Sequence, residues 1–220
     1  MKERWLCLPH SNQEADSKVE MSRQRNQKSV PLWMSISYTL MVCVIAPIYF
    51  KEYGAGNFLW FSDIAMFVMV PALWFRSSLL TSMMAIGVLP LEIPWLISFL
   101  SGGTILNLAD YMFDSTLPLY LRALSLFHFP MPACIIYMLW RFGYNTKALY
   151  PQMALSVIIL LLTRVLTSEN ENINRAFPPE FLHGILSPNA YLFSLMLLLI
   201  LGVIIPMHLL LKKYVPLNGR

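Results

Sequence analysis

Residues 190–211 read AYLFSLMLLLILGVIIPMHLLL, a run of 22 residues without Asp, Glu, Lys or Arg. A helix rises 1.5 Å per residue, so a run of this length spans the hydrocarbon core of a bilayer, which is about 30 Å thick. The whole chain has the same character, because 57% of its 220 residues are hydrophobic and only 13% are charged. Soluble domains carry about a quarter charged residues. The composition therefore predicts an integral membrane protein.

Apolar stretches of similar length predict an all-α, polytopic transmembrane helical bundle of about six spans. The expected spans cover residues 31–50, 57–75, 78–99, 117–140, 148–167 and 190–211. Residues 1–30 are expected to form a polar, disordered cytoplasmic tail without a cleaved signal peptide, and residues 212–220 a basic cytoplasmic tail. Three cysteines with no short spacing predict neither a disulfide framework nor a metal site.

The distribution of basic residues orients the predicted spans. Most of the 16 Lys and Arg residues fall in the two termini and in the second and fourth links, whereas the outer links hold only Lys51 and Arg175. Cytoplasmic segments of membrane proteins are enriched in Lys and Arg. We therefore expect both termini in the cytoplasm. We also expect the protein to lie in the bacterial inner membrane. The net charge of +4 reflects this topology and does not predict nucleic-acid binding.

Four charged residues lie inside the predicted spans: Asp63, Glu92, Arg122 and Arg164. A charge within a bilayer is expensive, so it usually has a partner and often a function. The orientation places all four in the outer half of the membrane, where the two acids and two bases could neutralise one another. The same charges could instead fix helix packing, or the arginines could extend to the headgroups.

Hydroxyl and imidazole groups accompany these charges. Ser125 and His128 follow Arg122 at intervals of three residues and so share its helical face, and Ser62 precedes Asp63. The sequence therefore predicts one polar centre, shared by the second to fifth spans and opening to the non-cytoplasmic side.

Two short segments carry a resemblance to a known family. Residues 59–65, LWFSDIA, and residues 126–129, LFHF, are similar to segments of the YwaF-like integral-membrane family, whose relatives include the androgen-induced lipid hydrolases of eukaryotes. The chain also resembles uncharacterised bacterial multi-pass membrane proteins. The first resemblance implies a helical bundle with acyl-ester chemistry on lipids, in which Ser62 occupies the position of a small nucleophile.

The resulting hypothesis is a site that binds a lipid or small amphiphile and, if the protein is an enzyme, transfers or hydrolyses an acyl ester. A hydroxyl needs an adjacent base to act as a nucleophile. The expected catalytic residues are Ser62 or Ser125 as nucleophile, His128 as base and Asp63 as the group that orients it, with Arg122, Arg164 and Glu92 binding substrate. No cofactor or metal is expected, and a homo-oligomer is an open alternative. A small proton-coupled transporter and a structural or assembly protein are the alternative functions.

Overall fold

The computed structural model describes residues 29–218, and these residues form helices joined by turns. Within the described range there is no β-strand, and one isolated bridge joins Tyr144 to Leu217. The all-α prediction is therefore confirmed. The α-helices are α2 (Leu32–Tyr53), α3 (Phe61–Trp74), α4 (Ser78–Gly87), α5 (Leu89–Leu100), α6 (Leu119–Leu124), α7 (Pro130–Phe142), α8 (Leu149–Leu166), α9 (Pro188–Leu197) and α10 (Ile205–Tyr214).

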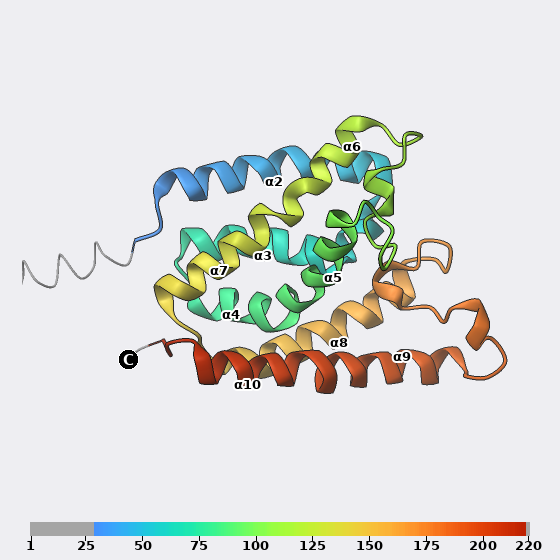
Figure 1. Cartoon of the computed structure of the whole chain (residues 1–220). Coiled ribbons are helices and arrows are strands. Elements are labelled where there is room, and N and C mark those ends of the chain that lie inside the picture. Colours follow the sequence, from blue (N-terminus) through green and yellow to red (C-terminus); the bar gives the residue numbers. More distant parts are fainter. Residues whose placement is uncertain (1–28, 219–220) are drawn as a thin grey trace, which may run out of the picture.

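Short helices complete the list. The 3₁₀ turns are η1 (Ala55–Leu59), η2 (Asp110–Met112), η3 (Ser125–His128), η4 (Thr146–Ala148), η5 (Ile173–Arg175) and η6 (Glu180–Leu182), and η7 (Leu198–Ile204) is a π-helical segment. Because η7 continues without a break between α9 and α10, these three form one long helix along the edge of the bundle (Figure 1).

Four helical stretches are long and apolar enough to cross a membrane: Leu32–Tyr53, Leu119–Phe142, Thr146–Leu166 and Pro188–Tyr214. The pair α4 and α5 makes a fifth if it is counted as one span bent by 53°. Helix α3 has only 14 residues, which corresponds to about 21 Å and is shorter than the hydrocarbon core. These helices indicate an integral membrane protein. The second apolar stretch of the sequence forms the short helix α3, and the third is broken into α4 and α5.

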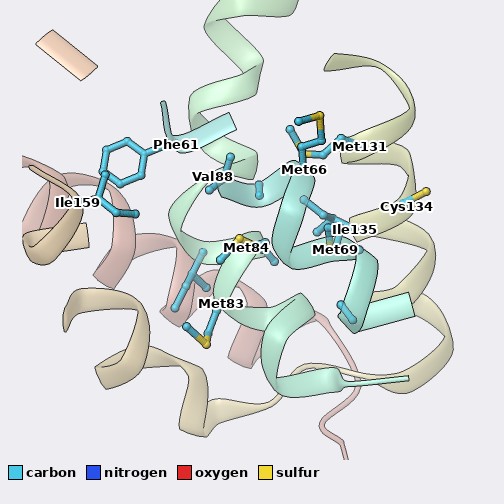
Figure 2. Close-up of a cluster of buried hydrophobic side chains, with 14 of the residues drawn as sticks. Phe61, Met66, Met69, Met83, Met84, Val88, Met131, Cys134, Ile135 and Ile159 are labelled. Atoms are coloured by element: carbon cyan, nitrogen blue, oxygen red, sulfur yellow. The ribbon is translucent and has the colours of Figure 1, made fainter. Parts of the chain in front are cut away.

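Helix α4 lies at the centre of the bundle. It packs against α3, α7, α8 and α10 and leads directly into α5. Eight of its ten residues are buried, which is what a helix surrounded on all sides requires. Figure 2 shows Met66 and Met69 of α3 beside Met84 of α4 and Met131 of α7. The flexible thioether side chains of these methionines fill the irregular space between the helices.

The outer helices present apolar side chains away from the core. Helix α2 packs on α3, while α10 packs on α4 and η7 on α8. Leu32 and Trp33 at the start of α2 and Leu198 and Leu201 in η7 are 60–70% exposed. Such extensive exposed apolar surface is typical of helices that face lipid.

The break between α4 and α5 has a local cause. A Cβ atom on Gly87 would lie 2.0 Å from Nε2 and 2.9 Å from Cγ of the buried Gln152 side chain, so a larger residue where α4 ends would force that side chain to move. Val88 then starts the new helix, because its carbonyl accepts from the amide of Glu92. Pro90 occupies the first turn of α5, where a missing N–H is tolerated. The bend consequently places Glu92 in the first turn of a helix, inside the bundle.

Candidate functional site

The centre of the site is a hydrogen-bonded pair of ionisable side chains. Nδ1 of His128 lies 2.6 Å from Oε2 of Glu92, and the two side chains are only 10% and 4% exposed. This distance is short for a hydrogen bond from nitrogen to oxygen, and an ionised partner shortens such bonds. With the carboxylate ionised, Nδ1–H donates to it, which fixes the tautomer of the imidazole and leaves Nε2 as the free nitrogen.

Local structure brings the two groups together. His128 ends the 3₁₀ turn η3, which interrupts the path from α6 to α7 directly before Pro130. Residues three apart eclipse one another in a 3₁₀ turn, so Ser125 and His128 share one side of it. The first turn of α5 approaches this side and supplies Glu92.

Aromatic rings hold the imidazole from its faces. Trp95 follows Glu92 by three residues on α5, and its ring stacks on His128 with centroids 4.2 Å apart and planes inclined by 18°. The Phe127 ring stacks at 4.3 Å. The indole N–H of Trp95 in turn donates to the hydroxyl of Tyr111 at 3.2 Å. These contacts restrict rotation of the imidazole and orient Nε2.

Hydroxyl groups surround the same turn. The Oγ atom of Ser125 donates to the carbonyl of Leu121 at 3.3 Å, which leaves the Tyr49 hydroxyl to donate to Ser125 at 2.8 Å. The hydroxyl of Tyr111 joins the same region through Trp95, whose ring stacks on His128. Helix α2, the turn η3 and the loop after α5 therefore meet in one polar network.

The loop of residues 101–118 is fastened to α5 next to this network. Oγ of the fully buried Ser98 accepts from the amides of Leu108 and Ala109 at 3.0 and 2.9 Å. Ala109 and Met112 pack with Trp95 in a small second core. The loop thereby positions Tyr111 against the Trp95 ring.

Asp63 lies in the first turn of α3 and is 3% exposed. Its Oδ2 atom accepts only a long contact of 3.5 Å from the side-chain amide of Asn57, and its Oδ1 atom has no hydrogen-bond partner. Asp63 interacts electrostatically with Glu92 and with Tyr49. It is therefore part of the same polar centre, although it makes no hydrogen bond to His128.

The start of α3 is held by a distant loop residue. Oδ1 of Asn174 accepts from the amide of Phe61 at 3.1 Å, and its Nδ2 donates to the carbonyl of Leu59 at 2.7 Å. Asn174 adopts φ +53°, a left-handed conformation that Asn tolerates better than most residues. This cap fixes the position from which Asp63 enters the centre.

The structure distributes the predicted site residues differently from the sequence-based expectation. Glu92, rather than Asp63, is the carboxylate bonded to His128. Arg122 donates to the carbonyl of Met112 at 3.3 Å, and the guanidinium of Arg164 stacks on Phe177 at 4.4 Å. Among the described residues neither arginine forms an ion pair with Asp63 or Glu92, so the expected neutralisation of two acids by two bases is not observed.

The two candidate nucleophiles also occupy different settings. Ser125 lies in the hydroxyl network, whereas Ser62 is half-buried beside Asp63. Neither serine makes a hydrogen bond to His128 within the part of the chain that the structure describes. A serine–histidine pair is therefore not preformed.

Sequence reasoning did not assign the residues that support the centre. Trp95 was detectable, because it follows Glu92 by three residues and so shares its helical face. Tyr49, Tyr111 and Asn174 reach the centre from other elements, and no local spacing connects them to Glu92 or His128.

A second buried histidine lies at the other end of α7. Nδ1 of His208 on α10 is 2.7 Å from the hydroxyl of Tyr144, which follows α7. The backbone of Tyr144 is bonded to that of the C-terminal segment, with its amide donating to Pro216 and its carbonyl accepting from Asn218. A Cβ on the neighbouring Gly143 would lie 2.6 Å from the carbonyl oxygen of Pro216. This region is a clasp that ties α10 to α7, and we call it the C-terminal clasp.

Compared with family models, with curated proteins and with solved structures, the chain gives no match. The resemblance to the YwaF-like family therefore stays a prediction. Among the described residues there is no group of three or more His, Cys, Asp or Glu side chains placed to hold a metal ion.

Proposed function

We propose that this integral membrane protein carries an acid–base site that acts on an ester bond of a lipid or small amphiphile. In this proposal the chain crosses the bacterial inner membrane six times, with both termini in the cytoplasm and the site in the outer half. The observation that carries the proposal is the 2.6 Å hydrogen bond between Glu92 and His128. A carboxylate that holds an imidazole in one tautomer is the arrangement of general acid–base catalysis.

The proposed chemistry follows from the free Nε2 atom of His128. It removes a proton from a water molecule as the water oxygen attacks the acyl carbonyl carbon, and Glu92 stabilises the imidazolium that forms. The carbon–oxygen bond to the leaving alkoxide then breaks, and Nε2 returns the proton to that oxygen. Water is the nucleophile in this scheme because neither Ser62 nor Ser125 hydrogen-bonds to His128.

The position of the pair suits an amphiphile. Ile93, which follows Glu92, is 53% exposed, and Phe129, which follows His128, is 39% exposed. Exposed apolar side chains thus adjoin both members of the buried pair, and in this proposal the hydrocarbon chain of the amphiphile packs against them.

The test is ester turnover by the purified protein in non-ionic micelles, measured by mass spectrometry over a panel of ester lipids. Glu92→Gln should reduce the rate by about 10²- to 10⁴-fold, because the base His128 loses the carboxylate that fixes its tautomer and stabilises its charged form. His183→Gln changes an exposed loop histidine and should leave the rate unchanged. Unchanged turnover in Glu92→Gln would contradict the proposal.

Ser125→Ala separates the two nucleophiles. If water attacks, this variant retains turnover within about tenfold, because only the network around His128 is altered. Formation of a covalent acyl-protein in the wild type and its loss in Ser125→Ala would assign the nucleophile to Ser125 instead.

A proton-coupled transporter is the second candidate, and the hydroxyl network favours it. Tyr49 and Ser125 share a hydrogen bond and Tyr111 bonds to Trp95, all beside the buried Glu92–His128 pair, and polar groups of this kind carry protons in membrane proteins. Proton flux into proteoliposomes that depends on Glu92, without ester turnover, would support the transporter over the hydrolase.

A further inference from the structure

Asp63 is a buried carboxylate without a counter-charge. The residue is 3% exposed, its Oδ1 atom has no hydrogen-bond partner, and the contact from Asn57 to Oδ2 is 3.5 Å long. Ordinary hydrogen bonds to oxygen measure 2.7–3.2 Å. Removing an ionised carboxylate from water is costly unless it is paired and hydrogen-bonded. Among the described residues this side chain therefore has no cationic partner, and its one hydrogen bond, from Asn57, is long.

The described groups around Asp63 supply no counter-charge. Glu92 is an acid that interacts unfavourably with an ionised Asp63. Among the described residues no Lys or Arg forms an ion pair with either acid, and His128 is already bonded to Glu92. The start of α3 contributes only the partial positive charge of a helix N-terminus, about half an elementary charge.

The neighbouring side chains indicate which kind of cation fits. Tyr49 is 4% exposed, interacts electrostatically with Asp63 and packs edge-on against Tyr53 with ring centroids 5.4 Å apart. Hydroxyl groups and aromatic rings bind organic ammonium groups by hydrogen bonds and cation–π contacts. A multivalent metal ion usually needs three or more protein ligands, and the described His, Cys, Asp and Glu residues form no such group.

We propose that Asp63 binds the ammonium group of a cationic amphiphile, with Oδ1 accepting from the N–H groups. The apolar helices around the centre then receive the hydrocarbon chain of the same molecule. This inference rests on the proposed function in one respect, because it names the substrate class of that site as amine-bearing esters. The binding step itself requires no ester chemistry.

The test is a binding titration of the full chain in non-ionic micelles, corrected with empty micelles. The probes are dodecylamine, dodecanol and dodecyl sulfate, which share a chain length and differ in head-group charge. We expect the wild type to bind dodecylamine at least about tenfold more tightly than dodecanol and to show no saturable binding of dodecyl sulfate. This first comparison needs no variant.

Variants then assign the binding to Asp63. Asp63→Asn should weaken dodecylamine binding at least about tenfold, whereas Asp63→Glu, which keeps the charge, should retain a preference for the amine. Asp114→Asn makes the same chemical change in an exposed loop and should leave the affinity unaltered. Gel filtration of each variant checks that it is folded.

Three results would overturn the inference. They are equal affinity of the wild type for the amine and the alcohol, unaltered amine affinity in Asp63→Asn, and displacement of the amine by millimolar sodium. If the wild type turns over esters but does not prefer dodecylamine to dodecanol, only this inference is rejected. Amine binding that depends on Asp63 in a protein without turnover would reject the ester chemistry alone.

Discussion

The two buried histidines of the described chain lie at opposite ends of α7 and differ in their partners. His128 is bonded to a carboxylate at 2.6 Å and lies beside an unpaired aspartate, whereas His208 is bonded to the neutral hydroxyl of Tyr144 at 2.7 Å. Tyr144 belongs to the C-terminal clasp, where its backbone amide and carbonyl are bonded to the C-terminal segment. Similar burial and similar distances thus support different interpretations, namely a reactive centre at one end and a fastening at the other.

The two regions differ in whether their buried polar atoms have hydrogen-bond partners. In the C-terminal clasp, the backbone amide and carbonyl of Tyr144 and its side-chain hydroxyl all have partners. In the polar centre, Oδ1 of Asp63 has none. Buried polar atoms without partners are rare in folded proteins and call for a water molecule, an ion or a ligand. A ligand is therefore expected at the first region and not at the second.

The largest expected effect is a difference in ester turnover between variants of the two histidines. His128→Gln should lower ester turnover by about 100-fold or more, because it removes the proton acceptor. His208→Gln should change turnover by less than about threefold. The measurement is the initial rate per folded protein in micelles. Comparable losses in both variants would contradict the assignment of the reactive centre to His128.

The next effect is a difference in the free energy of unfolding between variants of Glu92 and Tyr144, the partners of the two histidines. Glu92→Ala leaves a buried group without its ionic partner and should lower the free energy of unfolding by about 3–5 kcal/mol. Tyr144→Phe leaves His208 without a hydrogen bond and should lower it by about 1–3 kcal/mol. Denaturant unfolding in mixed micelles gives both values. A larger loss in Tyr144→Phe would reverse the assignment of the more costly buried contact.

Two glycines sharpen the comparison because they share a backbone conformation. Gly143 in the clasp has φ +75° and no room for a Cβ, whereas Gly54 after α2 has φ +78° and open space around it. Gly143→Ala should destabilise the protein by about 2–4 kcal/mol through strain and overpacking, and Gly54→Ala by about 1–2 kcal/mol through strain alone. Equal losses in thermal unfolding would show that the C-terminal segment does not press on Gly143.

The smallest expected effect concerns the loop beyond the polar centre. Asp114 accepts from the amide and hydroxyl of Thr116, and these hydrogen bonds hold the pKa of its carboxyl below the usual value. A lowered pKa adds stability above the pKa of the unfolded chain, and this stability is lost as the pH falls through the folded value. Hydrogen exchange at Thr116 should thus be faster in Asp114→Asn at pH 7, and the difference should vanish in strong acid.

The helices themselves were predictable, because each apolar run of the sequence is helical in the structure. Their uneven lengths were not. Helix α3 is short because the preceding residues form the turn η1. The third stretch breaks at Gly87, which lies against the side chain of the distant residue Gln152. Contacts of this kind between distant residues leave no periodic pattern in the sequence.

The polar centre was predictable in part. Charge in an apolar run identified Asp63 and Glu92, and helical spacing linked Ser125 with His128. Charge alone could not predict partners, because Arg122 donates to a backbone carbonyl and Arg164 stacks on a phenyl ring, and neither pairs with the acids. The choice of Glu92 as partner depends on the 53° bend of α4 and α5, which is a property of the packed bundle.

The central claim is that Glu92 and His128 act as one catalytic unit. It is tested most directly by a double-mutant cycle on kcat/KM with Glu92→Gln, His128→Gln and the combined variant. Groups that act as a unit are strongly non-additive, so the combined variant should be no slower than His128→Gln within about threefold. Single-variant losses that multiply in the combined variant would show that the two side chains act independently and would contradict the account.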